Sequence, residues 1–276
     1  MLLEFTKMHG LGNDFVVVDA VNQSFHPDSE QVRAIADRHF GVGCDQLLLV
    51  ERAQHPGADF RYRIFNADGV EVEQCGNGAR CFARFLRERG LWSGDRIRAE
   101  TRAGIITLRI EPDGQVTVAM GVPRFQPEQI PFLAAGRRDR YRLDLDGTSV
   151  VIGVVSMGNP HAVLQVDDVR EAPVAGLGAA IGASREFPQG VNVGFMQPVS
   201  GERIRLRVFE RGVGETLACG SGACAAMVVA RQWGLVDDRV MVELPGGSLQ
   251  IRWEGGESQV FMTGPATTVF EGRMEL

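Results

Sequence analysis

Lysine is almost absent from this sequence, because Lys7 is the only lysine among 276 residues. An enzyme that uses pyridoxal phosphate holds its cofactor through a lysine Schiff base. Only Lys7 is available for that bond, and its neighbours show no sign of a cofactor site. The chain also contains no GxxxxGK[ST] phosphate-binding loop. We therefore expect no cofactor and no amine chemistry that depends on pyridoxal phosphate.

Long apolar runs and clusters of basic charge are also missing. No stretch approaches the ~20 apolar residues of a membrane-spanning helix, and residues 1–10 do not have the layout of a signal peptide. A net charge of −6 and a pI near 5.5 argue against a surface for nucleic acid. Five cysteines fit reduced thiols better than a disulfide framework. We expect a cytoplasmic protein without a membrane or nucleic-acid partner.

The common metal-binding motifs are absent as well. The sequence has no CxxC and no HExxH, and the spacings from Cys75 to Cys81 and from Cys219 to Cys224 match no common zinc site. We expect no metal.

The second half of the chain repeats the first. Residues 63–90 align without a gap with residues 207–234, so that Cys75 corresponds to Cys219, 144 positions later. A period of this length is too long for a solenoid and indicates a duplicated domain. We expect one half at residues 1–120, with 265–276 returning to it, and the other half at 121–264.

Each half has the same predicted order of elements. FRYRIF (60–65) and RIRLRVF (203–209) alternate apolar and basic residues, as half-buried antiparallel strands do. After each cysteine, apolar residues follow at helical spacing as far as Gly90 or Gly234. The second of these helices carries few charges, which favours a fully enclosed position. The fold class is therefore α+β, with strands around one buried helix in each half.

The glycine-rich turn after each cysteine allows three interpretations. The first is purely structural, because most cysteines are buried and inert and glycines permit tight turns. The second is nucleotide binding, since GSGACA (220–225) matches GxGxxA and Glu243 follows about 20 residues later. However, GETLAC precedes that motif instead of an apolar strand, and the first copy, GNGARC, lacks the third small residue.

The third interpretation is catalytic. A cysteine at a helix N-terminus feels the positive end of the helix dipole, which lowers the pKa of its thiol. The N–H groups of the same turn can bind a carboxylate, and glycine lets it come close. Two such units acting on one carbon would remove a proton from one face and return it to the other, which inverts the stereocentre. The repeat favours this interpretation over the structural one.

Six motifs resemble the signatures of one known family, the cofactor-independent diaminopimelate epimerases. They are KMHGLGNDFVVVD (7–19), RIFNADG (63–69), CGNGARC (75–81), SMGNPH (156–161), ERGVGETLACGSGACA (210–225) and LPGGSL (244–249). The resemblance covers essentially the whole chain. It implies interconversion of LL- and meso-diaminopimelate in lysine biosynthesis, by a homodimer without metal or pyridoxal phosphate. It also implies two pseudo-symmetric domains, each a barrel-like antiparallel or mixed sheet around a central helix, with the active site in the cleft between them.

The same resemblance assigns roles to individual residues. Cys75 and Cys219 correspond to the two acid–base cysteines, and His161 and Glu210 to a pair that tunes their protonation. The substrate-binding positions are Asn13, Gln46, Asn66, Gly76, Asn77, Asn159, Asn192, Glu210, Arg211, Gly220 and Ser221. Among these, Gly76, Asn77, Gly220 and Ser221 correspond to the helix starts that hold the carboxylate. Cys44, Cys81 and Cys224 are expected to serve packing alone.

Other functions stay open at this point. A proline or hydroxyproline racemase or epimerase of the same fold is the alternative enzyme, although those relatives have His where this chain has Asn77. A binding module with an inert duplicated fold is the alternative outside enzymes. Asn66 and Asn192 could also be ordinary turn formers, and Glu210–Arg211 a solvated charge pair.

Overall fold

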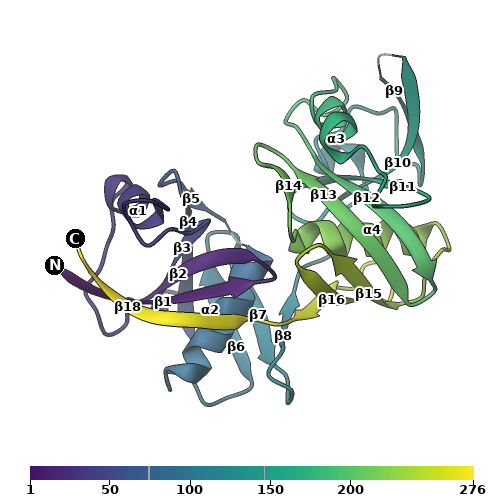
Figure 1. The fold of residues 1–276 in the computed structure, drawn as a ribbon. Coiled ribbons are helices and arrows are strands. Elements are labelled where there is room, and N and C mark those ends of the chain that lie inside the picture. The colour runs from purple at the N-terminus through teal and green to yellow at the C-terminus, as the bar shows by residue number, and fades with distance from the viewer. Residues whose placement is uncertain (74, 146) are drawn as a thin grey trace. The chain divides into compact units, whose positions relative to one another are not determined.

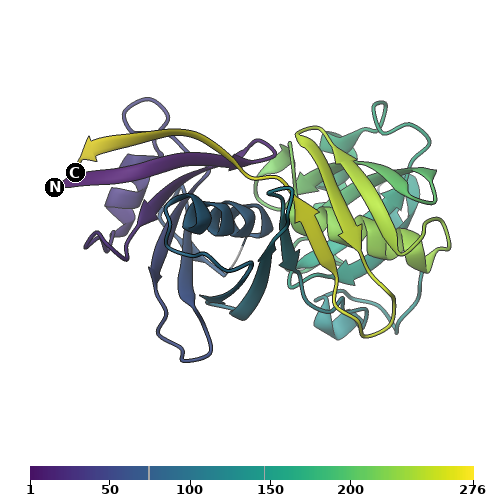
Figure 2. The ribbon, with the colours of Figure 1, turned by 90° about the horizontal axis from the view of Figure 1, so that it is seen from below.

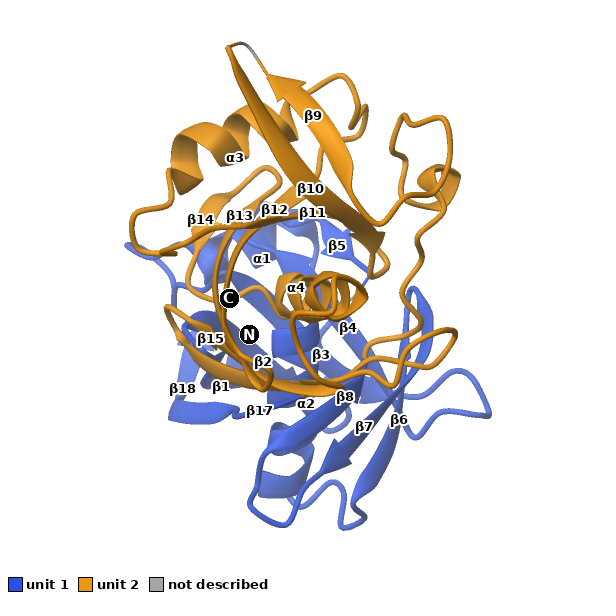
Figure 3. Cartoon of the chain, turned by 90° about the vertical axis from the view of Figure 1, so that its right-hand side faces the viewer, with its two compact units in different colours: residues 1–119, 263–276 blue, residues 120–262 orange. Residues whose placement is uncertain are grey.

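The computed structural model describes residues 1–73, 75–145 and 147–276. The chain divides into two compact units, which Figure 3 colours blue and orange. Unit 1 comprises Met1–Ala119 and Thr263–Leu276, and unit 2 comprises Met120–Met262. Each unit has its own set of strands and its own central helix, so the fold is α+β as predicted.

Unit 1 is a mixed sheet that contains both termini. Its strands are β1 (Leu2–Gly10), β2 (Asn13–Asp19), β3 (Gln46–Arg52), β4 (Phe60–Asn66), β5 (Glu71–Val72), β6 (Arg96–Thr101), β7 (Gly104–Ile110), β8 (Val116–Ala119) and β18 (Thr267–Glu275), while β17 (Phe261–Gly264) contains the boundary between the units. β1 pairs antiparallel with both β2 and β18, and the latter two run side by side with it in Figures 1 and 2. The β2–β3 and β4–β6 pairs are parallel.

The central helix of unit 1 is α2 (Gly76–Glu88), and α1 (Ser29–Ala36) connects β2 to β3. α2 packs against β1, β2, β7 and β8. Its buried side chains include Ala79, Phe82, Ala83 and Leu86, the positions that the helical spacing predicted. Gly90 ends the helix with φ +66°, a left-handed conformation that glycine adopts without a steric cost.

Unit 2 repeats this topology with different sequence. Its strands are β9 (Tyr141–Leu145), β10 (Thr148–Ser156), β11 (Pro160–Gln165), β12 (Asn192–Ser200), β13 (Arg203–Glu210), β14 (Gly214–Thr216), β15 (Arg239–Leu244) and β16 (Gly247–Arg252), and its helices are η1 (Pro127–Gln129), α3 (Val174–Gly182) and α4 (Gly220–Gln232). The β11–β12 and β13–β15 pairs are parallel, as β2–β3 and β4–β6 are in unit 1. The same order of pairings in both units is what a duplicated domain predicts.

α4 is enclosed by the strands of unit 2. Every residue from 222 to 230 is buried, and the helix packs against β10, β11, β12, β13, β15 and β16 (Figure 3). A Cβ added at Gly153 of β10 would lie 2.4 Å from a methyl carbon of Val229, so the strand approaches the helix too closely for any side chain there. The prediction of an enclosed second helix is confirmed.

The sequence-based prediction of the elements was incomplete. α1 and α3 were not predicted. Two internal glycines, Gly176 and Gly178, weaken the helical pattern of α3. No helix in the described part of the chain has the length and apolar character needed to cross a bilayer.

Candidate active site

Both cysteines of the repeat occupy the N-cap position of a central helix. Cys75 precedes α2 with φ −139° and ψ 121°, and Cys219 precedes α4 with φ −116° and ψ 108°. Their carbonyl oxygens accept the first helical hydrogen bonds, from Ala79 at 2.8 Å and Ala223 at 2.9 Å. The two thiols therefore leave the backbone at equivalent points of the two units, beside helix N-termini that favour anions.

In unit 1 the structure brings Asn13 and Asn77 to Cys75. Asn13 Oδ1 accepts from Cys75 Sγ at 3.6 Å and from Asn77 Nδ2 at 3.3 Å. The Tyr62 hydroxyl donates to the carbonyl of Cys75 at 3.1 Å and so ties β4 to the start of α2. Sequence reasoning missed Tyr62, because nothing in its strand distinguishes it from a core aromatic residue.

Asp45 orients Asn13 and was also missed. Its Oδ2 atom accepts from Asn13 Nδ2 at 3.0 Å and from the backbone N–H of Asp14 at 3.1 Å. Because a carboxylate only accepts, this contact directs the amide nitrogen of Asn13 to Asp45 and its oxygen to Cys75. Burial opposes the charge of Asp14, but hydrogen bonds from Arg38 and Lys7 hold the pKa of Asp14 at about 2. Lys7, the only lysine, therefore belongs to an ion-pair network around Asp14, the residue after Asn13.

Gln46 and Asn66 bond to each other. They face one another across β3 and β4, and Gln46 Nε2 donates to Asn66 Oδ1 at 2.8 Å. The backbone of Asn66 also opens a turn, since its carbonyl accepts from Gly69 and its N–H donates to Val70. Asn66 therefore has the turn-forming role that its sequence context allows, in addition to its contact with Gln46.

In unit 2, Cys219 is buried and lies beside a carboxylate. Burial raises the pKa of its thiol well above 9.0, and the negative charge of Glu210 raises it further. Hydrogen bonds from the Gly222 N–H and the Ser221 hydroxyl act in the opposite direction but do not prevail. The expectation that the helix start gives a lowered thiol pKa is therefore wrong for Cys219, whose raised pKa favours the thiol form.

A chain of polar groups runs from Cys219 to His161. Ser221 Oγ lies 3.7 Å from Cys219 Sγ and accepts from Asn159 Nδ2 at 3.4 Å. Asn159 Oδ1 lies 3.0 Å from His161 Nε2. Because an amide oxygen only accepts, this contact requires the proton on Nε2. Burial, followed by the charge of Arg211, lowers the pKa of His161 to about 3, so the ring is neutral.

Asn192 links two backbone segments, one next to His161 and one next to Glu210. Its Oδ1 accepts from the N–H of Arg211 at 2.9 Å, and its Nδ2 donates to the carbonyl of Pro160 at 3.3 Å. The residue is 5% exposed. In this structure its amide therefore joins β11 to the end of β13.

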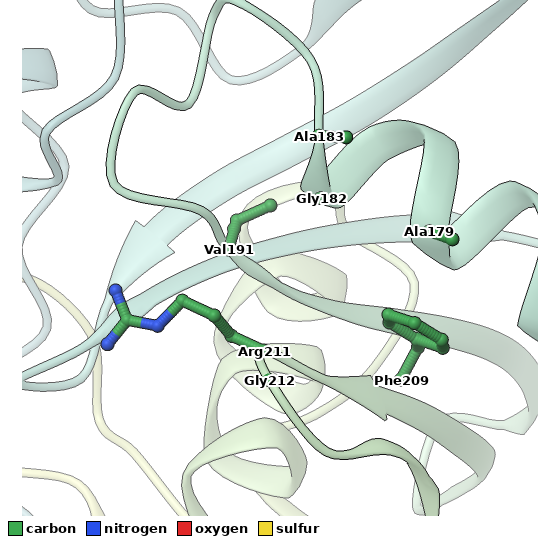
Figure 4. A pocket seen from close by; sticks show the side chains of 7 residues that line it. All are labelled: Ala179, Gly182, Ala183, Val191, Phe209, Arg211 and Gly212. Carbon is green, nitrogen blue, oxygen red and sulfur yellow. The ribbon is translucent and has the colours of Figure 1, made fainter.

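Glu210 and Arg211 follow each other at the end of β13 but have different surroundings. Glu210 accepts from the Thr216 hydroxyl, while Arg211 Nη1 donates to the carbonyl of Gln189 at 2.8 Å. A pocket of about 260 Å³ lies beside Arg211, lined by Ala179, Gly182, Ala183, Val191, Phe209, Arg211 and Gly212 (Figure 4). Cys219 and His161 do not line it, so the pocket contributes no proton-transferring group.

Comparison with known proteins identifies the family. A family model described as diaminopimelate epimerase matches residues 5–126 and 153–269. The chain belongs to the diaminopimelate epimerase family. It is 63% identical to the diaminopimelate epimerase of Thioalkalivibrio sulfidiphilus and 60% identical to that of Aromatoleum aromaticum, with 100% of each chain covered in both cases. The resemblance seen in the motifs is confirmed.

Solved structures with lower identity share the fold of this family member. One is a PhzF-family phenazine biosynthesis protein of Bacillus anthracis, 18% identical, with a TM-score of 0.71 over all of both chains. Another is a probable proline racemase of Agrobacterium radiobacter K84, 17% identical, with a TM-score of 0.72 over 99% of this chain and 93% of the other. At these identities the likeness concerns the fold alone.

The remaining cysteines of this family member are embedded in the core. Cys44, Cys81 and Cys224 are all buried. Burial raises the pKa of Cys44 to about 11 and that of Cys81 to about 12, which suits inert side chains.

Proposed function

We propose that this protein interconverts LL- and meso-diaminopimelate, as a step of lysine biosynthesis, without pyridoxal phosphate or a metal. The family model and the full-length relatives named diaminopimelate epimerase support this activity. The observation that carries the mechanism is the matching pair of thiols, Cys75 and Cys219, each at the N-cap of a central helix.

The proposed reaction removes one proton from the α-carbon and adds another proton to the opposite face of the same carbon. The thiolate of one cysteine takes the α-proton and becomes a thiol. The thiol of the other cysteine donates its proton to the opposite face and becomes a thiolate, so charge and protons balance. The raised pKa of Cys219 supports the proton-donating form for this residue in the substrate-free chain. Cys75 donates to Asn13 Oδ1 in this structure, so it releases that proton before it can act as the base.

We assign the substrate-binding residues by matching their charge and hydrogen-bonding groups to the carboxylates and ammonium groups of the substrate. Backbone N–H groups at Gly76, Asn77, Gly220 and Ser221 would hold the carboxylate at the reacting carbon and stabilise the negative charge that develops there. The guanidinium of Arg211 suits the distant carboxylate, and acceptors such as Glu210 suit an ammonium group. Asn13, with its oxygen directed to Cys75, offers a further acceptor. Gln46, Asn66, Asn159 and Asn192 complete the proposed binding set, with His161 beside Asn159.

The proline-type alternative has weaker support. Its structural relatives match this chain at 15–17% identity, whereas the relatives named diaminopimelate epimerase match at 57–63%. Proline-type relatives have His at the position of Asn77, and Arg211 with the cluster of Asn side chains suits a substrate with two charged ends. We further propose a cytoplasmic homodimer, which rests on the family resemblance.

Exchange of the α-proton with solvent tests the mechanism. Cys75→Ala and Cys219→Ala should each lower the rate of epimerisation by at least about 10²–10⁴-fold, the usual contribution of a general acid or base. The measurement is deuterium incorporation at the α-carbon of diaminopimelate in D₂O, with circular dichroism to show that each variant folds.

Cys224→Ala is the matched control, because Cys224 lies on α4 five residues after Cys219 and is buried in the core. It should retain the wild-type rate. Unchanged exchange in both active-site variants would exclude the two-thiol mechanism. Exchange with proline but none with diaminopimelate would support the alternative enzyme.

A further inference from the structure

A two-pronged ion pair occurs at equivalent positions of the two units. In unit 1, Arg63 Nε and Nη2 donate to the two oxygens of Glu71 at 3.0 and 2.8 Å. In unit 2, Arg207 Nε and Nη2 donate to the two oxygens of Glu215 at 2.6 and 2.9 Å. The offset between the pairs is 144 residues, the same as between Cys75 and Cys219. We call them the cysteine-segment ion pairs.

Each pair joins a long strand to the short strand that leads to a cysteine. Glu71 belongs to β5, which has two residues, and Glu215 to β14, which has three. Their registers match, because Glu71 lies opposite Phe65 and Glu215 lies opposite Phe209. Each cysteine follows three residues after the short strand ends. A strand this short has few ladder hydrogen bonds, so a side-chain contact contributes much of its attachment.

The other contacts of the two arginines differ. Arg63 also donates to Glu51 at 3.3 Å and lies over the ring of Phe65. Arg207 instead donates to backbone carbonyls, among them that of Val169 at 2.9 Å. What the two units share is therefore the attachment of the segment before the cysteine. The hydrogen bonds from Arg63 lower the pKa of Glu71, so that its carboxylate stays charged.

We propose that the cysteine-segment ion pairs are positioning residues: each fixes the short strand, β5 or β14, that precedes one of the two acid–base thiols. The catalytic consequence rests on the proposed function. The pairs touch no reacting atom, and they act through β5 and β14, the short strands that precede Cys75 and Cys219. Since a misplacement of about 1 Å can cost about 10²-fold in rate, loosening either segment should slow the proton transfer more than it weakens substrate binding.

The test is the reactivity of each thiol, measured separately. Glu71→Gln and Glu215→Gln keep the size of the side chain but remove its charge. The full-length protein is treated with iodoacetamide, and the alkylation rates of Cys75 and Cys219 are followed by peptide mass spectrometry. Glu71→Gln should change the rate at Cys75 several-fold and leave Cys219 at its wild-type rate. Glu215→Gln should do the reverse, so each variant is the control for the other.

A second control and the kinetics complete the experiment. Glu243→Gln removes a cross-strand partner of Arg205 on the same strand as Arg207 and should change neither thiol. With diaminopimelate, both test variants should lower kcat by about 10–100-fold and change KM far less. If either variant fails to fold, Glu71→Asp or Glu215→Asp should give smaller effects in the same direction.

Two results would overturn the proposal. One is an equal change in alkylation rate at both thiols in each variant, as general destabilisation produces. The other is an unchanged alkylation rate at both thiols. The alkylation result needs no turnover, so it stands apart from the proposed function. If the wild-type protein failed to epimerise diaminopimelate, the proposed function would be wrong while the thiol-specific effect could still be measured.

Discussion

Substitution of Gly78 tests how closely the start of α2 packs against β4 in unit 1. It is the third residue of the helix, and a Cβ added there would lie 2.5 Å from the Tyr62 hydroxyl oxygen and 3.1 Å from Ile64 Cδ1. Tyr62 is almost fully buried and donates to the carbonyl of Cys75. Gly78→Ala must therefore displace the tyrosine or the start of the helix.

The sign of the change in stability depends on which of the opposing free-energy contributions is larger. Replacing glycine by alanine inside a helix contributes about 0.8–1.0 kcal/mol of stability. Overpacking costs about 1–3 kcal/mol, and the lost hydrogen bond about 0.5–1.5 kcal/mol. Central values leave a net loss of about 2 kcal/mol, which lowers Tm by about 4–8 °C.

Thermal unfolding of four variants separates the terms. Gly176→Ala in α3 is the matched control, because its Cβ would meet no described atom within 4 Å, and it should raise Tm slightly. Tyr62→Phe removes the clashing oxygen, so adding Gly78→Ala to it should cost less than about 0.5 kcal/mol. If Gly78→Ala by itself stabilises as Gly176→Ala does, the close approach inferred for α2 and β4 is wrong.

Two further predictions concern protonation. His161 has a folded pKa of about 3 against 6.5 for an ordinary histidine, so the unfolded chain binds the extra proton and stability falls as pH decreases from about 6.5 toward 3. The loss of unfolding free energy between pH 7 and pH 4.5 is on the order of a few kcal/mol. It should be much smaller in His161→Gln and unchanged in the control His26→Gln. Parallel pH dependence in all three proteins would contradict the buried neutral ring. Glu210→Gln removes a charge that raises the pKa of Cys219, so iodoacetamide should modify Cys219 at a lower pH than in the wild type. The pH dependence of Cys44 alkylation should stay the same. An unchanged pH dependence for Cys219 would show that burial alone sets its pKa.

Much of the fold could be predicted because it depends on local periodicity. The alternation in residues 60–65 and 203–209 corresponds to β4 and β13, and the helical spacing after each cysteine corresponds to α2 and α4. α3 could not be predicted in this way, because its glycines weaken the pattern and packing on β12 and β13 stabilises it.

The candidate site was predictable only in its residue types. The motifs indicated Asn13 and Cys75, and the structure joins them through a contact of 3.6 Å. Asp45 and Tyr62 lay outside that prediction, because their roles arise from strands that meet only in the folded chain. The thiol pKa of Cys219 was predicted with the wrong sign for the same reason.

The sequence by itself determined the duplication, the α+β class, the family and the two cysteines at helix starts, because these depend on patterns along the chain. Only the tertiary structure decided which charges and amides surround each thiol. A helix dipole can be read from a motif, but burial and the approach of Glu210 to Cys219 require β13 and α4 to pack together. Desolvation and a nearby carboxylate outweigh the helix start, and so Cys219 remains protonated in the folded chain.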